Sequence, residues 1–597
     1  MTIKPIYENK KAPCFSQDAS GQTGCPALND IPGFLYAISQ KDYHLAFQIL
    51  KKTNPFSGGC GRFCDHPCEL ACNRAKFDKS VNIRDLERFV SDYAFQNNIT
   101  PQKIKNFANK SVAIIGGGPA GLTSAYFLKQ HGFKVDVYEK ERLMGGMMAQ
   151  GIPLFRYPTE ILEWEVDYIK KLGIDMFPNH PVALDDFKKL NKEYDYVVAS
   201  TGSHKPRKMG VPGEKSDAVS VGLDFLKKLN LSAEFREKLE HSEVAKTIEM
   251  GQSVAVIGGG YTAIDVARCA TRLGKKVTVI YRRSESDLNI HPGEVEECIK
   301  EGIDFQFYMT PAEIPETRNH DNTVTVKLEK MITGEIGPDG KSSIMPSGEF
   351  IENRFHSVVK AIGETPDLSY LPEAYEIKGN HLLIRGNKSP SFIAGDARYG
   401  YARDIGMVVR AIGSGRNTAS EIVAHSTGKK PIWYKESKIA FYNTIKPRYF
   451  KKQPRTINDE LKKQDRTGNF NELTLPLSDN EAIFSASRCF YCGICTQCDW
   501  CFHYSLGAIA KVDKPWNGQR DERYFKFLNE KSGKQTRESV EACPRNAMGF
   551  LNFENIPTGS DAKKQYTTMD KLLATAKRSA ASQKSSDKRG KRVQGST

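Results

Sequence analysis

The chain has 597 residues and a formal net charge of +15, with 39% hydrophobic and 26% charged residues. That length is enough for three or four domains, and the absence of any run of about 18 apolar residues argues against a membrane-spanning helix. The N-terminus, Met-Thr-Ile-Lys-Pro, leads into no apolar run, so we expect no secretion signal and a cytoplasmic protein.

Six of the fourteen cysteines gather in residues 14–72. Four of them form a C-x3-C-x3-C-x3-C run, and cytosolic proteins seldom use such dense cysteines for disulfides. Clustering with even spacing predicts a metal site, either an iron–sulfur cluster or, alternatively, zinc. The six candidate ligands are Cys14, Cys25, Cys60, Cys64, Cys68 and Cys72.

Residues 111–125 read SVAIIGGGPAGLTSA and predict a strand, a glycine-rich turn and a helix. This pattern is typical of the βαβ unit that opens a dinucleotide-binding fold. Gly116 permits the tight turn, Gly118 lets a pyrophosphate approach the backbone, and Gly121 lets the helix pack against the sheet. Glu139 ends the second strand, where a carboxylate can accept hydrogen bonds from a ribose 2′-hydroxyl.

Residues 253–267 read SVAVIGGGYTAIDVA and align with the first unit without a gap. Gly258, Gly260 and Ala263 take the three positions of its glycines. One such motif is weak evidence, whereas two copies in the same strand–turn–helix context strongly predict two nucleotide sites.

The two units differ at the position that reads the ribose. Tyr281 stands where the first unit has Glu139, and Arg282 and Arg283 follow it. Two guanidiniums suit a 2′-phosphate, so the second site is expected to favour NADPH over NADH. A solvated strand end is the alternative interpretation of the arginines. We therefore expect FAD in the first unit and NADPH in the second.

A third segment, SFIAGDARY at 391–399, predicts a strand that ends in Gly395 and Asp396. In flavoproteins with two such folds, this aspartate faces the ribityl chain and phosphate of the flavin. The following segment, 404–415, is expected to form a helix whose N-terminus meets the flavin ring.

The second group of cysteines lies near the C-terminus, with five at every third position and Cys543 directly before a proline. The five are Cys489, Cys492, Cys495, Cys498 and Cys501. Thiolates spaced C-x2-C-x2-C, completed by a distant Cys-Pro, hold cubane clusters in ferredoxin-type domains. We expect the last three to bind one [4Fe-4S] cluster with Cys543. The first two would be spare, and either pack structurally or replace a ligand.

Residues 561–597 hold ten Lys or Arg and three Asp, a net charge of +7. A tail rich in Ser, Ala and Lys with few apolar residues is expected to be disordered. A solubilising role is the simpler interpretation, and docking to an acidic partner is the alternative. Because Tyr566 is its only aromatic residue, nucleic-acid binding is not expected.

Over about residues 12–430, the chain resembles the small subunit of glutamate synthase and its relatives. The supporting stretches are GGGPAGL at 116–122, VYEKERLMGGMMAQGIPLFRYP at 137–158, STG at 200–202, VPGE at 211–214, YRRS at 281–284, AIGETPD at 361–367 and AGDAR at 394–398. Two more, CPALNDIPGFLYAI at 25–38 and NPFSGGCGRFCDHPCELAC at 54–72, resemble the helical iron–sulfur domain that also opens dihydropyrimidine dehydrogenase.

The resemblance implies one N-terminal [4Fe-4S] cluster, with the ligands Cys25, Cys64, Cys68 and Glu87. The family commonly has C-x2-C before the Cys-Pro, whereas this chain has only Cys14 there. A second cluster would have to use Cys14, Cys60 and Cys72, one thiolate short, so we expect one cluster in this domain. Further nucleotide contacts implied by the family are Pro119, Ala120, Gly146, Thr201, Gly202, Tyr261, Thr262, Gly363, Met407 and Val408.

The implied fold is α/β, with two Rossmann-like domains of the flavin disulfide reductase type between a helical iron–sulfur domain and a ferredoxin-like domain. The C-terminal extension resembles that of larger iron–sulfur flavoproteins that work beside dissimilatory sulfite reductase or 2-oxoacid:ferredoxin oxidoreductases. The expected boundaries are 1–106 for the helical domain, 107–245 plus 355–430 for FAD, 246–354 for NAD(P)H, 431–480 for a linker, 481–555 for the ferredoxin-like domain and 556–597 for the tail.

These features predict an oxidoreductase subunit that passes electrons from NAD(P)H through FAD and [4Fe-4S] clusters to a partner enzyme or ferredoxin, in a hetero-oligomer. No side-chain acid, base or nucleophile is expected to be essential. Disulfide reduction is disfavoured because residues 143–148 contain no cysteine. The alternatives are the glutamate synthase small subunit itself, or a non-catalytic scaffold or sensor with structural clusters.

Overall fold

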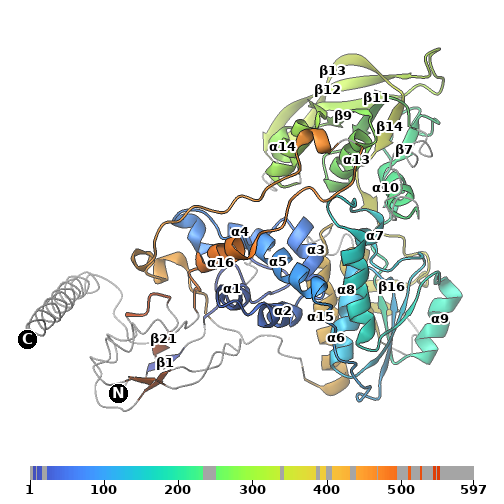
Figure 1. Cartoon of the computed structure of the whole chain (residues 1–597). Coiled ribbons are helices and arrows are strands. Elements are labelled where there is room, and N and C mark those ends of the chain that lie inside the picture. Colours follow the sequence, from blue (N-terminus) through green and yellow to red (C-terminus); the bar gives the residue numbers. More distant parts are fainter. Residues whose placement is uncertain are drawn as a thin grey trace, which may run out of the picture.

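Two α/β units and a helical region are arranged around a common centre, as the computed structural model in Figure 1 shows. The structure describes residues 5–7, 10–15, 23–232, 250–288, 290–336, 342–384, 390–398, 406–429, 438–466, 468–493, 509–511, 525–527, 542–545 and 548–550. None of its described helices is long and apolar enough to cross a membrane.

The N-terminal region is helical. Its elements are α1 (Ile31–Ser39), α2 (Tyr43–Lys51), α3 (Ser57–Phe63), α4 (Pro67–Leu70), the 3₁₀ turn η1 (Asn73–Lys76) and α5 (Ile83–Gln96). Asp30 and Asp42 cap α1 and α2, each accepting a hydrogen bond from a backbone N–H of the first turn. A Cβ at Gly61 would lie 2.4 Å from the backbone nitrogen of Arg88. Glycine at this position therefore lets α3 cross α5 closely.

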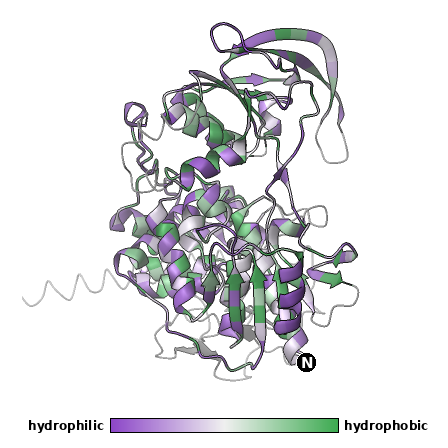
Figure 2. Ribbon diagram, turned by 90° about the vertical axis from the view of Figure 1, so that its right-hand side faces the viewer, coloured by the Kyte–Doolittle hydropathy of each residue, from purple (hydrophilic) through white to green (hydrophobic). Residues whose placement is uncertain are grey.

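The first α/β unit is built on a seven-stranded sheet. Its strands are β2 (Ser111–Ile115), β3 (Lys134–Tyr138), β4 (Asp175–Phe177), β5 (Tyr196–Ala199), β16 (Tyr375–Lys378), β17 (His381–Ile384) and β18 (Ser391–Ile393), and its helices are α6 (Pro119–Gln130), α7 (Met147–Gln150), α8 (Thr159–Lys171), α9 (Leu184–Glu193) and α15 (Val408–Thr427). The order is β16-β17-β18-β5-β2-β3-β4, parallel from β18 onward. Buried on both faces, its central strands read as apolar runs, largely green in Figure 2.

The second α/β unit has a five-stranded parallel sheet in the order β10-β9-β8-β14-β7. Its elements are β7 (Val219–Val221), α10 (Gly222–Asn230), β8 (Ser253–Ile257), α13 (Tyr261–Arg272), β9 (Lys276–Tyr281), the 3₁₀ turn η2 (Glu285–Asp287), α14 (Pro292–Glu301), β10 (Asp304–Phe307) and β14 (Ser357–Lys360). An antiparallel sheet caps it at the top of Figure 1, formed by β11 (Met309–Glu313), β12 (Val324–Ile336) and β13 (Ser342–Phe355).

The chain enters the second unit before the predicted boundary at 245 and returns to the first unit after the predicted boundary at 355. Strands β7 and β14 both belong to the second sheet, although the expected boundaries assign them to the FAD domain. The crossings are paired antiparallel as β6 (Lys205–Pro206) and β15 (Glu364–Thr365). A short apolar run identifies a strand but not the sheet that it joins, which explains the difference.

Residues 438–478, most of the predicted linker, form an extended strap over the helical region and the second unit (Figure 1, orange). It contains the 3₁₀ turns η4 (Tyr442–Thr444), η5 (Pro447–Tyr449) and η6 (Lys463–Asp465). Glu472 pairs with Arg62 at 2.8 Å, and Arg466 pairs with Glu297 at 2.6 Å. The strap therefore ties two domains together, and it leads into α16 (Asp479–Ser487).

The two ends of the chain also meet. Strand β1 (Pro5–Tyr7) pairs antiparallel with β21 (Met548–Phe550), beside each other at the lower left of Figure 1. A further antiparallel pair joins β19 (Ile509–Lys511) and β20 (Phe525–Phe527). The predicted tail, 556–597, and most of the predicted ferredoxin-like domain lie outside the described residues.

Candidate functional site

A cleft of about 770 Å³ runs along the carboxyl ends of the strands of the first sheet. This volume suits a nucleotide cofactor, because ligand pockets span about 300–1,000 Å³. Most residues predicted to bind FAD line it: Gly116, Gly118, Pro119, Ala120, Glu139, Gly146, Thr201, Gly202, Gly363, Asp396, Met407 and Val408. The arrangement matches the site that α/β folds provide at the N-terminus of the helix after the first strand.

The glycines of the first turn fit a bound pyrophosphate. A Cβ at Gly116 or Gly121 would meet backbone oxygen at 2.5 Å or 2.1 Å, so both positions require glycine for packing. At Gly118 the nearest atom to an added Cβ is the Gly146 Cα, 3.8 Å away. Packing therefore explains Gly116 and Gly121, whereas Gly118 faces space that a phosphate could occupy.

Glu139 is fixed in place by the backbone around it. Its two carboxylate oxygens accept hydrogen bonds from the N–H groups of Gly117 at 2.8 Å and Glu141 at 2.9 Å. Burial raises the pKa of this carboxyl despite those bonds. The carboxylate is thus held beside the glycine turn, in the position that a ribose hydroxyl needs.

The far wall of the cleft is the segment that leads into α15. Gly395 has φ of +64°, and a Cβ there would lie 2.7 Å from the Ala120 Cβ. Asp396 accepts a hydrogen bond from the Gly406 N–H at 3.2 Å, and burial raises its pKa. The helix starts at Val408, later than the expected 404, and its first N–H groups have no side-chain cap. Residues 401–405 lie outside the described residues.

His204 also lines the FAD cleft and was not identified from the sequence. Its Nδ1 is buried and has no hydrogen-bond partner among the described residues. Burial, with Lys227 and Lys140 nearby, lowers the pKa of the imidazole to about 4. A buried ring nitrogen without a protein partner, in a cleft of this size, fits a bound cofactor that offers it a hydrogen bond.

The second glycine turn is positioned by the same principle. Gly258 has φ of +143°, and a Cβ there would lie 2.2 Å from the Ala361 oxygen, whereas Gly260 has nothing within 4 Å. Arg282 is exposed. Arg283 donates a hydrogen bond to the Ser342 carbonyl on β13, so Arg282 is the freer of the two to meet a 2′-phosphate.

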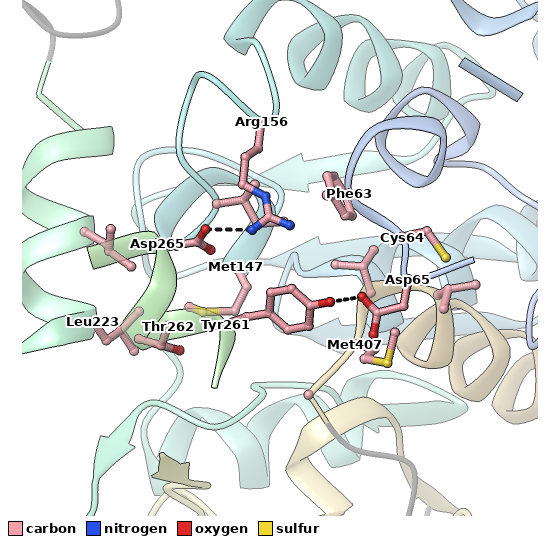
Figure 3. A pocket seen from close by; sticks show the side chains of 16 residues that line it. Phe63, Cys64, Asp65, Met147, Arg156, Leu223, Tyr261, Thr262, Asp265 and Met407 are labelled. Atoms are coloured by element: carbon pink, nitrogen blue, oxygen red, sulfur yellow. Dashed lines mark hydrogen bonds and ion pairs between the residues drawn. The ribbon is translucent and has the colours of Figure 1, made fainter. Parts of the chain in front are cut away.

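A smaller pocket of about 140 Å³, which we call the junction pocket, lies where the two α/β units meet the helical region (Figure 3). Tyr261, at the start of α13, donates a hydrogen bond to Asp65, the residue after Cys64. Arg156 bridges to Asp265 and to a glutamate on α14 at 2.8 Å each. Burial raises the pKa of Asp265 to about 6, although Arg156 opposes the shift. No sequence motif indicates these contacts, because they join residues of different domains.

A third cavity, in the helical region, brings together the predicted ligands of the first cluster, and we call it the cluster cavity. Its lining includes Cys25, Cys64, Cys68 and Glu87, and also Cys60. The Asn29 and His66 N–H groups donate to the sulfurs of Cys25 at 3.4 Å and Cys64 at 3.3 Å. Such N–H···S bonds are among the features that tune iron–sulfur clusters.

The ligand groups of this cavity are strongly desolvated. Burial raises the pKa of Cys25 to about 11 and that of Glu87 to about 8. Asn29 and Asn54 donate to the same oxygen of Glu87 at 2.9 Å and 2.8 Å. Buried acidic groups of this kind are stable as anions only beside positive charge, and cluster iron would supply it. Cys25, Cys64, Cys68 and Glu87 therefore fit a cluster.

Among the described residues, the other cysteines predicted as ligands do not line the cluster cavity. Cys72 is not among the residues that line the cluster cavity, and it interacts with Cys489 and Cys492, all three being buried. Cys14 is buried close enough to interact with Cys68, and Cys543 is half-buried. The three predicted ligands Cys495, Cys498 and Cys501 lie outside the described residues.

Comparison with known families places the same features in the same parts of the chain. Residues 110–381 match the pyridine nucleotide-disulphide oxidoreductase family, and residues 8–99 match domain II of dihydropyrimidine dehydrogenase, a 4Fe-4S cluster domain. These matches confirm the predicted dinucleotide-binding fold and the N-terminal iron–sulfur domain.

Three curated proteins are similar to this chain over more than half of its length. The β subunit of the NADPH-Fe(3+) oxidoreductase of Geobacter sulfurreducens is 31% identical over 542 residues, which are 82% of this chain and 76% of that one. The β subunit of the NADP(+)-dependent formate dehydrogenase of Moorella thermoacetica is 34% identical, over 63% and 54%. The small chain of the NADPH glutamate synthase of Azospirillum brasilense is 30% identical, over 68% and 86%.

Proposed function

This chain belongs to the family of NAD(P)H-dependent iron–sulfur flavoproteins related to the small subunit of glutamate synthase, and we propose that it is the electron-input subunit of a larger oxidoreductase. It would take electrons from NADPH and pass them singly to a partner protein. The described relatives support this role, since two are β subunits and one is a small chain.

The observation that carries the proposal is the continuity of three cavities. The FAD cleft and the junction pocket share five lining residues, among them Thr262 at the start of α13 and Met407 before α15. The junction pocket and the cluster cavity share Cys64 and Val409. A flavin in the cleft would therefore have the second nucleotide unit on one side and a cluster ligand on the other.

The chain's own residues would bind and orient the cofactors. Gly118 and the N-terminus of α6 would receive the FAD pyrophosphate, Glu139 its ribose, and the first turn of α15 the flavin ring. Cys25, Cys64, Cys68 and Glu87 would hold the first cluster. FAD, when bound, accepts two electrons together and releases them one at a time, which suits a carrier that accepts one.

We further propose that the second unit prefers NADPH, through Arg282, and that a C-terminal cluster on Cys495, Cys498, Cys501 and Cys543 provides the exit toward the partner. The spacing of these cysteines supports the cluster. We favour a partner enzyme with its own acceptor site over glutamate synthesis. The cysteine-rich extension at 481–555 would add an electron carrier that small subunits of the glutamate synthase type do not need.

The test is an anaerobic titration of the purified protein with NADPH. We expect the flavin absorbance to bleach first and the cluster absorbance to follow. Unchanged flavin and cluster spectra at excess NADPH would contradict the proposal. Copurification with a large glutamine-hydrolysing subunit would instead favour the glutamate synthase alternative.

A further inference from the structure

Cys72 does not lie with the ligands of the first cluster. It directly precedes η1 as its N-cap residue, and the first residue of η1, Asn73, donates a hydrogen bond from Nδ2 to the Cys492 sulfur at 3.2 Å. A thiolate at Cys489 or Cys492 would interact with one at Cys72. Thus the helical region and the start of the C-terminal cysteine run, more than 400 residues apart in the sequence, meet at one buried group of sulfurs.

The approach of Cys489 is fixed by a fully buried arginine. Arg488 has no exposed surface, and it donates to the Lys79 carbonyl at 2.8 Å and to the Ser80 carbonyl at 3.0 Å. It also pairs with Asp78 at 3.3 Å, while Arg74 donates to the Arg488 carbonyl. A buried charge held by this many partners locks the residue after α16 onto the loop that follows Cys72.

Aromatic packing fixes the two residues between Cys489 and Cys492. Phe490 lies 5.5 Å from Phe77 and 4.3 Å from Phe450, ring centre to ring centre. Tyr491 packs edge-on against Tyr36 of α1 at 5.5 Å, and its N–H donates to the Cys489 sulfur at 3.2 Å. Both side chains are buried, so this segment is part of the core of the helical region.

The N-terminal segment that carries Cys14 closes the same place. A Cβ at Gly493 would lie 2.1 Å from the Lys10 oxygen, which places residue 10 directly against the end of the C-x2-C pair. Lys11 exchanges backbone hydrogen bonds of 2.8 Å with the strap at Lys438 and Ala440. The Ala440 carbonyl also accepts from Asn73 at 2.8 Å. Cys14 follows this segment and is buried.

We propose that Cys72, Cys489 and Cys492, with Cys14 as the fourth thiolate, hold a second [4Fe-4S] cluster in the helical region. Two of the four thiolates, Cys489 and Cys492, are then supplied from the far end of the chain. Each ligand thiol would lose its proton as its sulfur binds iron. Cys489 and Cys492 are therefore not spare, and the five evenly spaced cysteines are divided, two for this cluster and three for the ferredoxin-like one.

Cys60 fits this ligand set less well than Cys14. Cys60 lines the cluster cavity and interacts with Glu87 and Cys64. Cys14 is not among the lining residues of that cavity, and it follows the segment that lies against Gly493. No three His, Cys, Asp or Glu side chains in the described part of the chain are grouped to hold a single ion. A cubane spreads its thiolates over four irons, so its ligands need not be grouped tightly enough to hold a single ion.

The role of this cluster as an electron carrier depends on the proposed function, whereas its existence does not. The experiment therefore measures iron, acid-labile sulfide and the electron paramagnetic resonance spectrum after chemical reduction, with no NADPH. It uses the full chain purified without oxygen, as wild type and as C14S, C72S, C489S, C498S and the C489S/C498S double variant. The matched control is C298S, which changes a fully buried cysteine on α14.

We expect C489S and C498S each to lose one cluster's iron and sulfide, with different signals missing, and the double variant to lose two. C14S and C72S should lose the same signal as C489S, and C298S should lose none. Full flavin content in each variant would show that the chain has folded.

Three results would overturn the assignment. One is unchanged iron in C489S. Another is a double variant that loses no more iron than either single variant, because both cysteines would then serve one cluster. The third is loss of the C498S signal, rather than the C489S signal, on changing Cys14. A cluster found here in a protein that NADPH does not reduce would leave this inference standing and refute the proposed function.

Discussion

In the first dinucleotide unit a second loop packs against the glycine turn, whereas the described residues of the second unit leave Gly260 open. The Gly145 N–H donates to the Gly117 carbonyl at 2.8 Å, and Gly146 packs against Gly118. At Gly260 of the second unit an added Cβ would meet nothing within 4 Å. We therefore expect the enclosed turn to suit a cofactor that stays bound and the open turn to suit one that exchanges.

The largest effect should follow from adding one methyl group to the helix that follows the enclosed turn, where it packs against that turn. In Gly121→Ala the new Cβ would lie 2.1 Å from the Gly116 oxygen and 2.6 Å from the Ser200 hydroxyl. We expect a loss of about 3 kcal/mol in the free energy of unfolding, the upper end of overpacking effects, and most of the FAD. Thermal unfolding and the flavin absorbance of the purified protein measure both.

The matched variant in the second unit is Ala263→Gly. It gives the open turn the glycine of the enclosed one, and should cost only about 1 kcal/mol through helix propensity. FAD content should not change. If Gly121→Ala kept its full flavin content, the enclosed turn would not be the reason for cofactor retention.

A smaller effect is expected at the ribose end of the second unit. Arg282→Asp with Arg283→Ala should weaken NADPH binding by about 2 kcal/mol, roughly 30-fold, because a charge-assisted hydrogen bond to the 2′-phosphate is lost. NADH binding should be nearly unchanged. Steady-state KM values for both nucleotides measure the shift.

The single variants sharpen this prediction. Because Arg283 is held by the Ser342 carbonyl, Arg282→Ala should account for most of the loss and Arg283→Ala for little. Equal KM values for NADPH in the wild type and the double variant would place the phosphate elsewhere.

The smallest effect concerns acid and the first unit. Burial lowers the pKa of His204 to about 4, so below about pH 6.5 the unfolded chain binds a proton that the folded one does not. The free energy of unfolding therefore decreases as the pH is lowered, by about 1 kcal/mol from pH 7 to pH 5.5. His204→Gln should remove that part of the acid sensitivity in FAD-free protein, as urea unfolding at the two pH values would measure. An unchanged pH dependence would rule out His204 as its source.

Local motifs were predictable because their parts are close in sequence. Each strand–glycine turn–helix needs only about fifteen residues, and both form as expected. The ligands Cys64 and Cys68 are also near neighbours, and they line one cavity with Cys25 and Glu87. In contrast, the junction pocket, with its Tyr261–Asp65 hydrogen bond, joins distant segments and left no sequence signal.

The sequence by itself determined the two nucleotide folds and the iron–sulfur character of the helical region, because short-range spacing encodes turns, caps and thiolate pairs. Only the tertiary structure decided which sheet takes β7 and β14, where the strap lies, and which side Cys489 and Cys492 face. Those outcomes depend on burial between remote segments, such as Arg488 against Lys79 and Ser80. Spacing along a chain carries no information about such contacts.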